Sequence, residues 1–119
     1  MAKLYFKYGA MGSSKTASAL MCKFNYETRG FNVYLFKPTL DNRCVINGIP
    51  MVSSRIGLKS ECIEFSKEDN FFNLAKRYDI LHEKNIIIVD ECQFMTTSQV
   101  DQLKELSLSV TVLCYGLLT

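Results

Sequence analysis

Two short segments of the sequence combine residue types that can bind and transfer phosphate. Residues 9–16 read GAMGSSKT and directly follow the β-prone run KLYFKY. Asp90 and Glu91 directly follow the apolar run IIIV. A phosphoryl-transfer site needs backbone amides and a cation around the phosphates, a carboxylate for magnesium, and a group that orients or deprotonates the nucleophile. The two segments together supply each of these groups.

The first segment fits the phosphate-loop pattern G-x-x-x-x-G-K-[ST] at Gly9, Lys15 and Thr16. In this pattern the loop amides converge on phosphate oxygens, the next helix directs its positive end at them, the lysine reaches the terminal phosphates and the hydroxyl binds magnesium. Ser14 stands where the pattern has glycine, while Gly12 lies two residues earlier. A serine Cβ at this position can crowd the phosphates or strain the backbone. The alternative interpretation is an ordinary turn of small residues between a strand and a helix.

The second segment places two carboxylates at the end of a predicted strand. Residues 86–89 are four consecutive β-branched residues between polar ones, a pattern typical of a strand buried on both faces. Asp90 and Glu91 are therefore candidates for a magnesium ligand and a general base. The alternative is that both are solvated acids that begin a loop, since carboxylates are usually exposed. The presence of both segments in one chain, in the matching order, favours the functional interpretation.

Apolar periodicity predicts alternating strands and helices along the chain. The predicted strands are residues 4–8, 32–36, 62–65, 86–89 and 110–116. A helix over 14–29 has Ala17, Leu20, Met21 and Phe24 on one face and ends at Gly30. A second helix has its apolar face at Phe71, Leu74, Tyr78 and Leu81. A third begins with a capping box at Thr96 and Gln99 and has its apolar face at Val100, Leu103 and Leu106.

The polar stretch over residues 39–60 shows little periodicity, and we interpret it as a long functional loop. Strands separated by helices or long crossovers imply a mainly parallel sheet, whose ligands bind at the carboxyl ends of the strands. We therefore expect an α/β chain with a P-loop (RecA-like) three-layer fold and a mainly parallel sheet, forming one nucleotide-binding core over residues 1–119.

Composition narrows the class of partner. The 119 residues are 48% hydrophobic, and 14 Lys and Arg residues nearly balance 12 Asp and Glu residues, for a formal charge of +2. This balance argues against a nucleic-acid or membrane partner and favours a small molecule, and we expect a cytoplasmic location. The five cysteines, at 22, 44, 62, 92 and 114, are odd in number and include no C-x-x-C pair. We expect reduced thiols, several of them in the core, rather than disulfides or a zinc site.

Five segments occur in order along most of the chain: KLYFKYGAMGSSKT, YLFKPTLDNR, VSSRIGL, IIIVDECQF and VLCYGL. Together they resemble the type II thymidine kinase family of bacteria, animal cytosol and poxviruses. The resemblance implies an enzyme that transfers the γ-phosphoryl group of ATP to the 5′-hydroxyl of thymidine or deoxyuridine, giving dTMP and ADP with Mg²⁺ as cofactor.

The resemblance also implies roles for individual residues. The ATP phosphates would be surrounded by Gly9, Ala10, Met11, Gly12, Ser13, Ser14, Lys15, Thr16 and Arg43. Magnesium would be held, directly or through water, by Thr16, Asp90 and Asp41. Glu91 would be the general base, and Met11 and Phe94 would flank the thymine.

Simpler interpretations stay open for three of these positions and for Arg55 in the segment VSSRIGL. Asp41 and Arg43 fit a surface turn built on Asp41-Asn42. Phe94 fits a core aromatic at a strand-to-helix junction. Arg55 is as consistent with a solvated loop charge as with a ligand contact.

The chain also departs from the family pattern. Its last residues, Gly116-Leu117-Leu118-Thr119, lack the acid and the aromatic residue that the family has after this strand. We expect an ATP-binding core without the family's C-terminal part, whose zinc site and thymine-gripping lasso have no counterpart here, so that no residue of this chain binds zinc. The family's tetramers suggest a homo-oligomer. Three hypotheses follow: a nucleoside kinase, an ATP-binding remnant or module without turnover, and a different P-loop NTPase.

Overall fold

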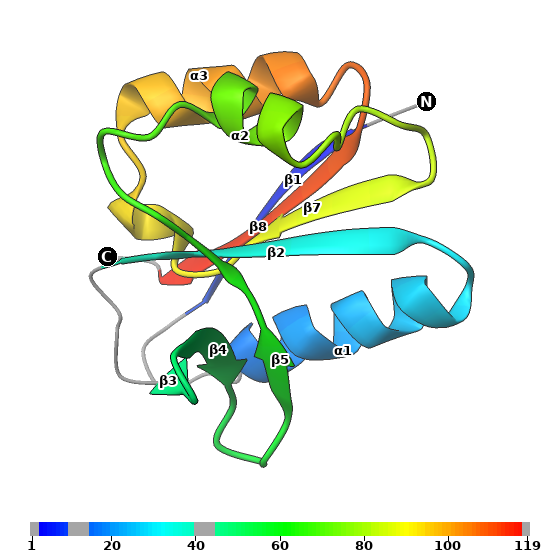
Figure 1. The fold of residues 1–119 in the computed structure, drawn as a ribbon, viewed down its shortest axis with the longest axis vertical. Helices are drawn as coiled ribbons and strands as arrows, with labels where there is room; N and C mark the ends of the chain where they lie inside the picture. Colours follow the sequence, from blue (N-terminus) through cyan, green and yellow to red (C-terminus); the bar gives the residue numbers. More distant parts are fainter. Residues whose placement is uncertain (1–2, 10–14, 40–44, 118–119) are drawn as a thin grey trace.

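The computed structural model describes residues 3–9, 15–39 and 45–117 of the chain. These residues form a central sheet with the strand order β1-β8-β7-β2-β6, and each neighbouring pair in it is parallel (Figure 1). The prediction of a mainly parallel sheet is confirmed. The strands are β1 (Leu4–Gly9), β8 (Thr111–Leu117), β7 (Asn85–Val89), β2 (Asn32–Pro38) and β6 (Ile63–Phe65).

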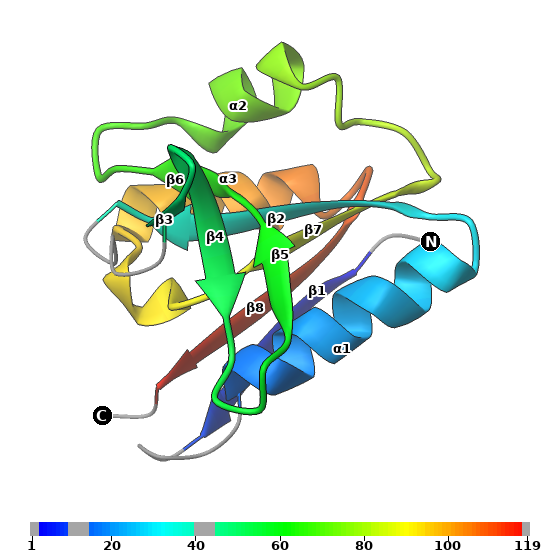
Figure 2. The same ribbon diagram turned by 60° about the horizontal axis from the view of Figure 1, so that its bottom comes forward.

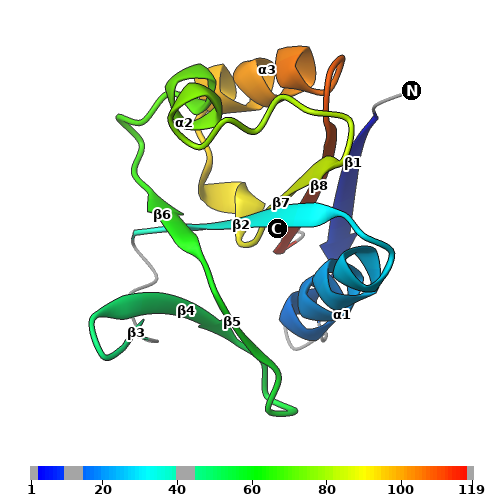
Figure 3. The same cartoon turned by 45° about the vertical axis from the view of Figure 1, so that its right-hand side comes forward.

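Helices cover both faces of this sheet. Helix α1 (Lys15–Thr28) lies on one face, whereas α2 (Phe71–Arg77) and α3 (Thr97–Leu106) lie together on the other (Figure 3). A short 3₁₀ helix, η1 (Cys92–Phe94), connects β7 to α3. The expected three-layer α/β arrangement is thus confirmed. Over the described ranges, no helix combines the length and apolar character that crossing a membrane requires.

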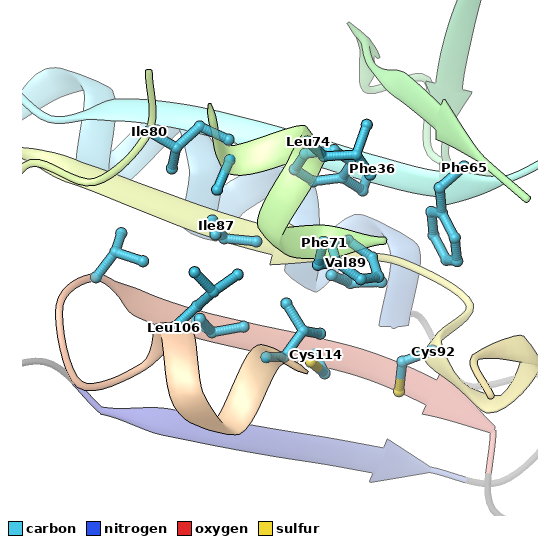
Figure 4. Packing of buried hydrophobic residues seen from close by; sticks show 14 residues of the cluster. Phe36, Phe65, Phe71, Leu74, Ile80, Ile87, Val89, Cys92, Leu106 and Cys114 are labelled. Carbon is cyan, nitrogen blue, oxygen red and sulfur yellow. The ribbon is translucent and has the colours of Figure 1, made fainter. Parts of the chain in front are cut away.

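The core extends over both faces of the sheet, and β7 contributes to both sides. All of its residues are buried, as the β-branched run predicts. Ile87 and Val89 belong to the cluster that includes α2 and α3, shown in Figure 4, whereas Ile86 and Ile88 belong to the cluster that includes α1. The first cluster also contains Phe36, Phe65, Phe71, Leu74, Ile80, Leu103 and Leu106, and the second contains Ala19, Leu20, Leu35, Leu113 and Tyr115.

Two of the predicted helix ends are confirmed in detail. Gly30, with φ of 90°, follows α1 in the left-handed conformation that glycine adopts without strain. At the start of α3 the Thr96 hydroxyl accepts a hydrogen bond from the Gln99 N–H at 3.1 Å, and the Gln99 side chain accepts one from the Thr96 N–H at 3.1 Å. This is the predicted capping box.

Two predicted helix faces are partly wrong. In α1 the predicted Ala17 and Leu20 are buried together with Ala19, but Met21 is 53% exposed. Helix α2 ends at Arg77, because Asp79 adopts the left-handed conformation with φ of 53°. Beyond this residue Ile80 is buried and Leu81 is exposed. The predicted apolar face of the helix therefore does not continue to Leu81.

The prediction of a long loop over residues 39–60 is wrong for its described part. Residues from 45 onward form a small antiparallel sheet with the order β3-β4-β5, which lies beside the start of α1 (Figure 2). Its strands are β3 (Val45–Ile46), β4 (Ile49–Ser53) and β5 (Lys59–Glu61).

A turn signal in the sequence explains this small sheet. Asn47 and Gly48 both have positive φ, 54° and 78°, and they connect β3 to β4 as a two-residue hairpin turn. Asn-Gly favours such turns because both residues tolerate left-handed backbone angles. The strands are too short to show periodicity, so the dipeptide was the informative signal.

Lys37 connects the small sheet to the central one. This residue of β2 is 1% exposed, and its ammonium group donates a hydrogen bond to the carbonyl oxygen of Met51 in β4 at 2.9 Å. Burying an ammonium group is costly unless it is hydrogen-bonded. The contact therefore fixes β4 against the end of β2.

We expect Ile88→Val to lower the free energy of unfolding by about 0.5–1.5 kcal/mol, because it removes a methylene group from a side chain that is 0% exposed. Urea denaturation monitored by circular dichroism measures the change. Ile56→Val is the matched control, since Ile56 is 69% exposed in the turn between β4 and β5. Equal destabilisation by the two substitutions would contradict the assignment of β7 to the centre of the core.

Candidate functional site

The candidate site lies at the carboxyl edge of the central sheet. Strand β1 ends at Gly9 and β7 ends at Val89, with β8 paired in parallel between them. Helix α1 begins at Lys15, close to the end of β1 (Figure 2). The described residues of both sequence segments therefore lie at one edge, as parallel strands require. They are Gly9, Lys15 and Thr16 of the first segment and Asp90 and Glu91 of the second.

Lys15 and Thr16 occupy the first turn of α1. The Lys15 ammonium group donates a hydrogen bond to the carbonyl oxygen of Gly9 at 3.4 Å, which holds the lysine back over the end of β1. The Thr16 hydroxyl donates one to a carboxylate oxygen of Asp90 at 3.2 Å. Residues separated by 74 positions thus lie side by side. Lysine, hydroxyl and carboxylate are the groups that a magnesium–phosphate complex requires.

Asp90 directly follows the last residue of β7 and is buried. Its N–H donates to the carbonyl oxygen of Phe36 at 2.9 Å, which continues the pairing with β2, and the residue is 5% exposed. A buried carboxylate needs hydrogen-bond donors or a cation nearby. The Thr16 hydroxyl provides one of its donors. The aspartate is therefore held in place by the backbone on one side and by α1 on the other.

Glu91 has an unusual backbone conformation. Its φ and ψ are 55° and 43°, in the left-handed region that non-glycine residues seldom adopt. Such strain often marks functional positions. The conformation turns the chain from β7 into η1, where the Phe94 N–H donates to the Glu91 carbonyl oxygen at 3.1 Å. The Glu91 carboxylate accepts a hydrogen bond from the Gln93 side-chain amide at 3.4 Å.

Two buried thiols lie near the acidic pair: Cys92 is the next residue in the chain, and Cys114 lies in β8 beside β7. Burial, and secondarily the negative charges of Asp90 and Glu91, raise the pKa of Cys92 to about 11, although a hydrogen bond with Tyr8 opposes the shift. Burial also raises the pKa of Cys114. Both thiols are therefore protonated at neutral pH and serve as packing groups. They are buried and free, which confirms that several cysteines lie in the core.

A groove of about 530 Å³ runs along α1 from the candidate site. It contains the cationic side chains of Lys7, Lys15 and Arg29, and none of its described lining residues is acidic. Such a groove attracts anionic ligands. It is lined by Lys7, Lys15, Ser18, Met21, Cys22, Asn25, Tyr26, Arg29 and Tyr115.

The donor set at the edge suits magnesium. Mg²⁺ prefers oxygen ligands and is commonly held by one or two protein groups together with the phosphates of a substrate. Thr16 and Asp90 supply a hydroxyl and a carboxylate oxygen within 3.2 Å of each other. Among the residues the structure describes, there is no cluster of three or more His, Cys, Asp or Glu that is suited to a protein-bound metal.

The remaining candidate residues have different placements. Phe94 is 40% exposed in η1, so it is not a buried core aromatic. Arg55 is exposed in the turn between β4 and β5. The other candidates lie outside the described residues: Ala10, Met11, Gly12, Ser13, Ser14, Asp41 and Arg43.

Sequence reasoning missed two residues at this edge. Lys37 was considered only as part of the segment YLFKPTLDNR, whereas its ammonium group connects two sheets. Gln93 was interpreted only as part of a motif, whereas its side chain contacts Glu91. A polar residue two positions after an acidic pair is a signal that could have indicated the second contact.

The parallel sheet, the helix that begins at Lys15 and the contact between Thr16 and Asp90 define the fold as the P-loop α/β class. The family model described as "Thymidine kinase" matches residues 2–119. The chain therefore belongs to the thymidine kinase family.

Curated relatives agree with this assignment. A protein named thymidine kinase from Aliivibrio fischeri is 42% identical over 121 residues, which cover 100% of this chain and 62% of the relative. Relatives with the same name from Rhodopirellula baltica and Legionella pneumophila are 40% and 39% identical, and the matches cover 56% and 57% of their lengths. The chain thus spans roughly three fifths of the relatives it matches.

We expect the protein to lose stability as the pH rises from about 9 toward 11, because the Cys92 thiol ionises near 9 when unfolded and near 11 when folded. The unfolded state releases its proton first, so deprotonation favours unfolding. Cys92→Ala removes this contribution. The destabilisation of Cys92→Ala relative to the parent, measured by urea denaturation, should therefore be smaller at pH 11 than at pH 7. A difference that stays constant with pH would contradict the shifted pKa.

Proposed function

We propose that this chain is the ATP-binding part of a thymidine kinase and transfers the γ-phosphoryl group of ATP to the 5′-hydroxyl of thymidine or deoxyuridine, giving dTMP and ADP. The observation that carries the proposal is the contact between Thr16 and Asp90, since it joins the phosphate-loop helix to the acidic strand end. Membership of the thymidine kinase family supports the choice of acceptor.

In this proposal the phosphates lie against the backbone of residues 9–14 and the N-terminus of α1. The Lys15 ammonium group already lies at the end of β1 and reaches the terminal phosphates by exchanging its hydrogen bond with the Gly9 carbonyl for one with phosphate. The cationic groove along α1 adds attraction for an anionic ligand. Arg43 is proposed to help neutralise the transferred group.

Thr16 and Asp90 are proposed to hold Mg²⁺, directly or through water, together with Asp41. The ion would neutralise phosphate charge and align the transferred group. The Thr16 hydroxyl and the Asp90 carboxylate are both fixed by surrounding structure, so they are oriented before any ligand binds. Such prior orientation reduces the reorganisation that catalysis requires.

Glu91 is proposed as the general base. Its carboxylate would accept the proton of the nucleoside 5′-hydroxyl as that oxygen attacks the γ-phosphorus, which requires an approach to about 3 Å. The side chain is partly exposed next to Asp90, so an acceptor bound at this edge can reach it. Met11 and the partly exposed Phe94 are proposed to flank the thymine.

A second candidate function is an ATP-binding module without turnover. The contacts at this edge, from Thr16 to Asp90 and from Lys15 to Gly9, involve groups proposed for magnesium and phosphate, which such a module also needs. Both candidates bind ATP. They differ in whether thymidine causes ADP to form.

Product formation by the purified chain with Mg-ATP, with and without thymidine, distinguishes the two candidates. We expect dTMP and ADP in equal amounts and only when thymidine is present. ATP binding without thymidine-dependent ADP would favour the module, whereas ADP formation without thymidine would indicate a different NTPase.

We expect Glu91→Gln to lower turnover by about 10²–10⁴-fold, because it removes the proton acceptor while preserving side-chain size. ATP affinity, measured by calorimetry, should stay within about twofold of the parent because the base does not bind the phosphates. Glu105→Gln, an exposed substitution on α3, is the control and should keep parental turnover. Full activity of Glu91→Gln would show that Glu91 is not the base.

A further inference from the structure

We propose that Gln93 is a positioning residue that holds the Glu91 carboxylate by linking it to the end of β8. This inference rests on the proposed function, in which Glu91 is the general base. It assigns a role to a side chain that lies between the acidic pair and the last described strand.

The Gln93 carboxamide makes hydrogen bonds in two directions. Its oxygen accepts a hydrogen bond from the Leu117 N–H at 3.1 Å, and its nitrogen donates one to a carboxylate oxygen of Glu91 at 3.4 Å. A backbone N–H can only donate and an ionised carboxylate can only accept. The two partners therefore require the same orientation of the amide, with its oxygen toward β8 and its nitrogen toward Glu91.

Gly116 provides independent support for this link. A Cβ atom at position 116 would lie 2.7 Å from the Cys92 sulfur and 2.9 Å from the Gln93 side-chain oxygen. The backbone N–H of Gln93 would be only 3.3 Å away. Only glycine leaves room for the carboxamide in its observed place. The end of β8 is thus shaped to accept the Gln93 side chain.

The backbone around Glu91 makes such a link useful. Glu91 lies in the left-handed conformation between β7 and η1, and its carboxylate is on a partly exposed side chain with several rotatable bonds. A misplacement of about 1 Å at a reacting group can lower a rate by about 10²-fold. The amide of Gln93 restricts the carboxylate to the side of Glu91 that faces β8, and so increases the fraction of molecules with the base in place.

A purely structural role, in which Gln93 only ties η1 to β8, makes a different prediction. Gln93→Glu keeps an acceptor of the same length for the Leu117 N–H but replaces the amide donor with a negative charge beside Glu91. A structural tether would tolerate this change. A positioning residue would not, because the carboxylate of Glu91 is then repelled rather than held.

The test compares Gln93→Glu and Gln93→Met with Gln102→Met. Gln102 is a matched control on α3: its side chain accepts from the Phe71 N–H at 2.8 Å and donates to the Ser98 hydroxyl at 3.2 Å, and the residue, like Gln93, is partly buried. Thermal unfolding, KM for ATP and kcat for thymidine are measured for each chain. We expect both Gln93 variants to lose about tenfold or more in kcat, with KM for ATP within about twofold of the parent.

Gln102→Met should lose a similar amount of thermal stability to Gln93→Met and keep the parental kcat. Parental kcat in Gln93→Glu would overturn the proposal. So would a fall in kcat of the same size in Gln102→Met, because that result would attribute the loss to stability alone.

A second measurement is independent of turnover. In the ¹⁵N-labelled protein, the side-chain amide signals of Gln93 should shift on Glu91→Gln substitution, while those of Gln102 should not. If the parent chain shows no thymidine-dependent turnover, the proposed function fails. The amide signals still test whether the Gln93 side chain contacts the Glu91 carboxylate. Gln93 amide signals that do not respond to Glu91→Gln would overturn the positioning role regardless of activity.

Discussion

The hydrogen bond between the Thr16 hydroxyl and the Asp90 carboxylate is the contact on which the site depends. It joins the first turn of α1 to the end of β7 at 3.2 Å, and it provides a donor for a carboxylate that is only 5% exposed. A buried acid without partners would be strongly unfavourable, so the helix and the strand end are constrained together. This constraint places Lys15, the Thr16 hydroxyl and two carboxylates at one edge of the sheet.

The packing of the sheet maintains that arrangement. Strand β7 is buried on both faces, with Ile88 against the layer of α1 and Ile87 against the layer of α2 and α3. The backbone N–H of Asp90 continues the pairing of β7 with β2, which prevents the aspartate from leaving the edge. Beyond it, the left-handed conformation of Glu91 directs the chain into η1. The Gln93 side chain then accepts a hydrogen bond from the Leu117 N–H at the end of β8. The proposed base thus lies on a short segment attached to the sheet at both ends.

Much of this arrangement could be predicted from local patterns. The β-branched run at 86–89, the helical spacing around Leu103 and the capping box at Thr96 each depend on neighbouring residues, and each is confirmed. The placement of Thr16 and Asp90 at one edge of the sheet followed from the rule for parallel strands. Two of the failed predictions depended on turns: Asn47-Gly48 forms a hairpin that periodicity cannot detect, and α2 ends before Leu81 because Asp79 is left-handed. The contact between Gln93 and Glu91 depends on side-chain geometry that spacing alone does not encode.

Calorimetric titration of ATP, with and without Mg²⁺, tests most directly whether Thr16 and Asp90 together form the magnesium end of a nucleotide site. We predict that Mg²⁺ tightens ATP binding to the parent chain by about tenfold or more, as expected for new charge-assisted contacts. Asp90→Asn keeps the size of the side chain and removes its charge, and we predict that ATP affinity in this variant no longer depends on Mg²⁺. An equal effect of Mg²⁺ on both chains would contradict the assignment of Asp90 to the site.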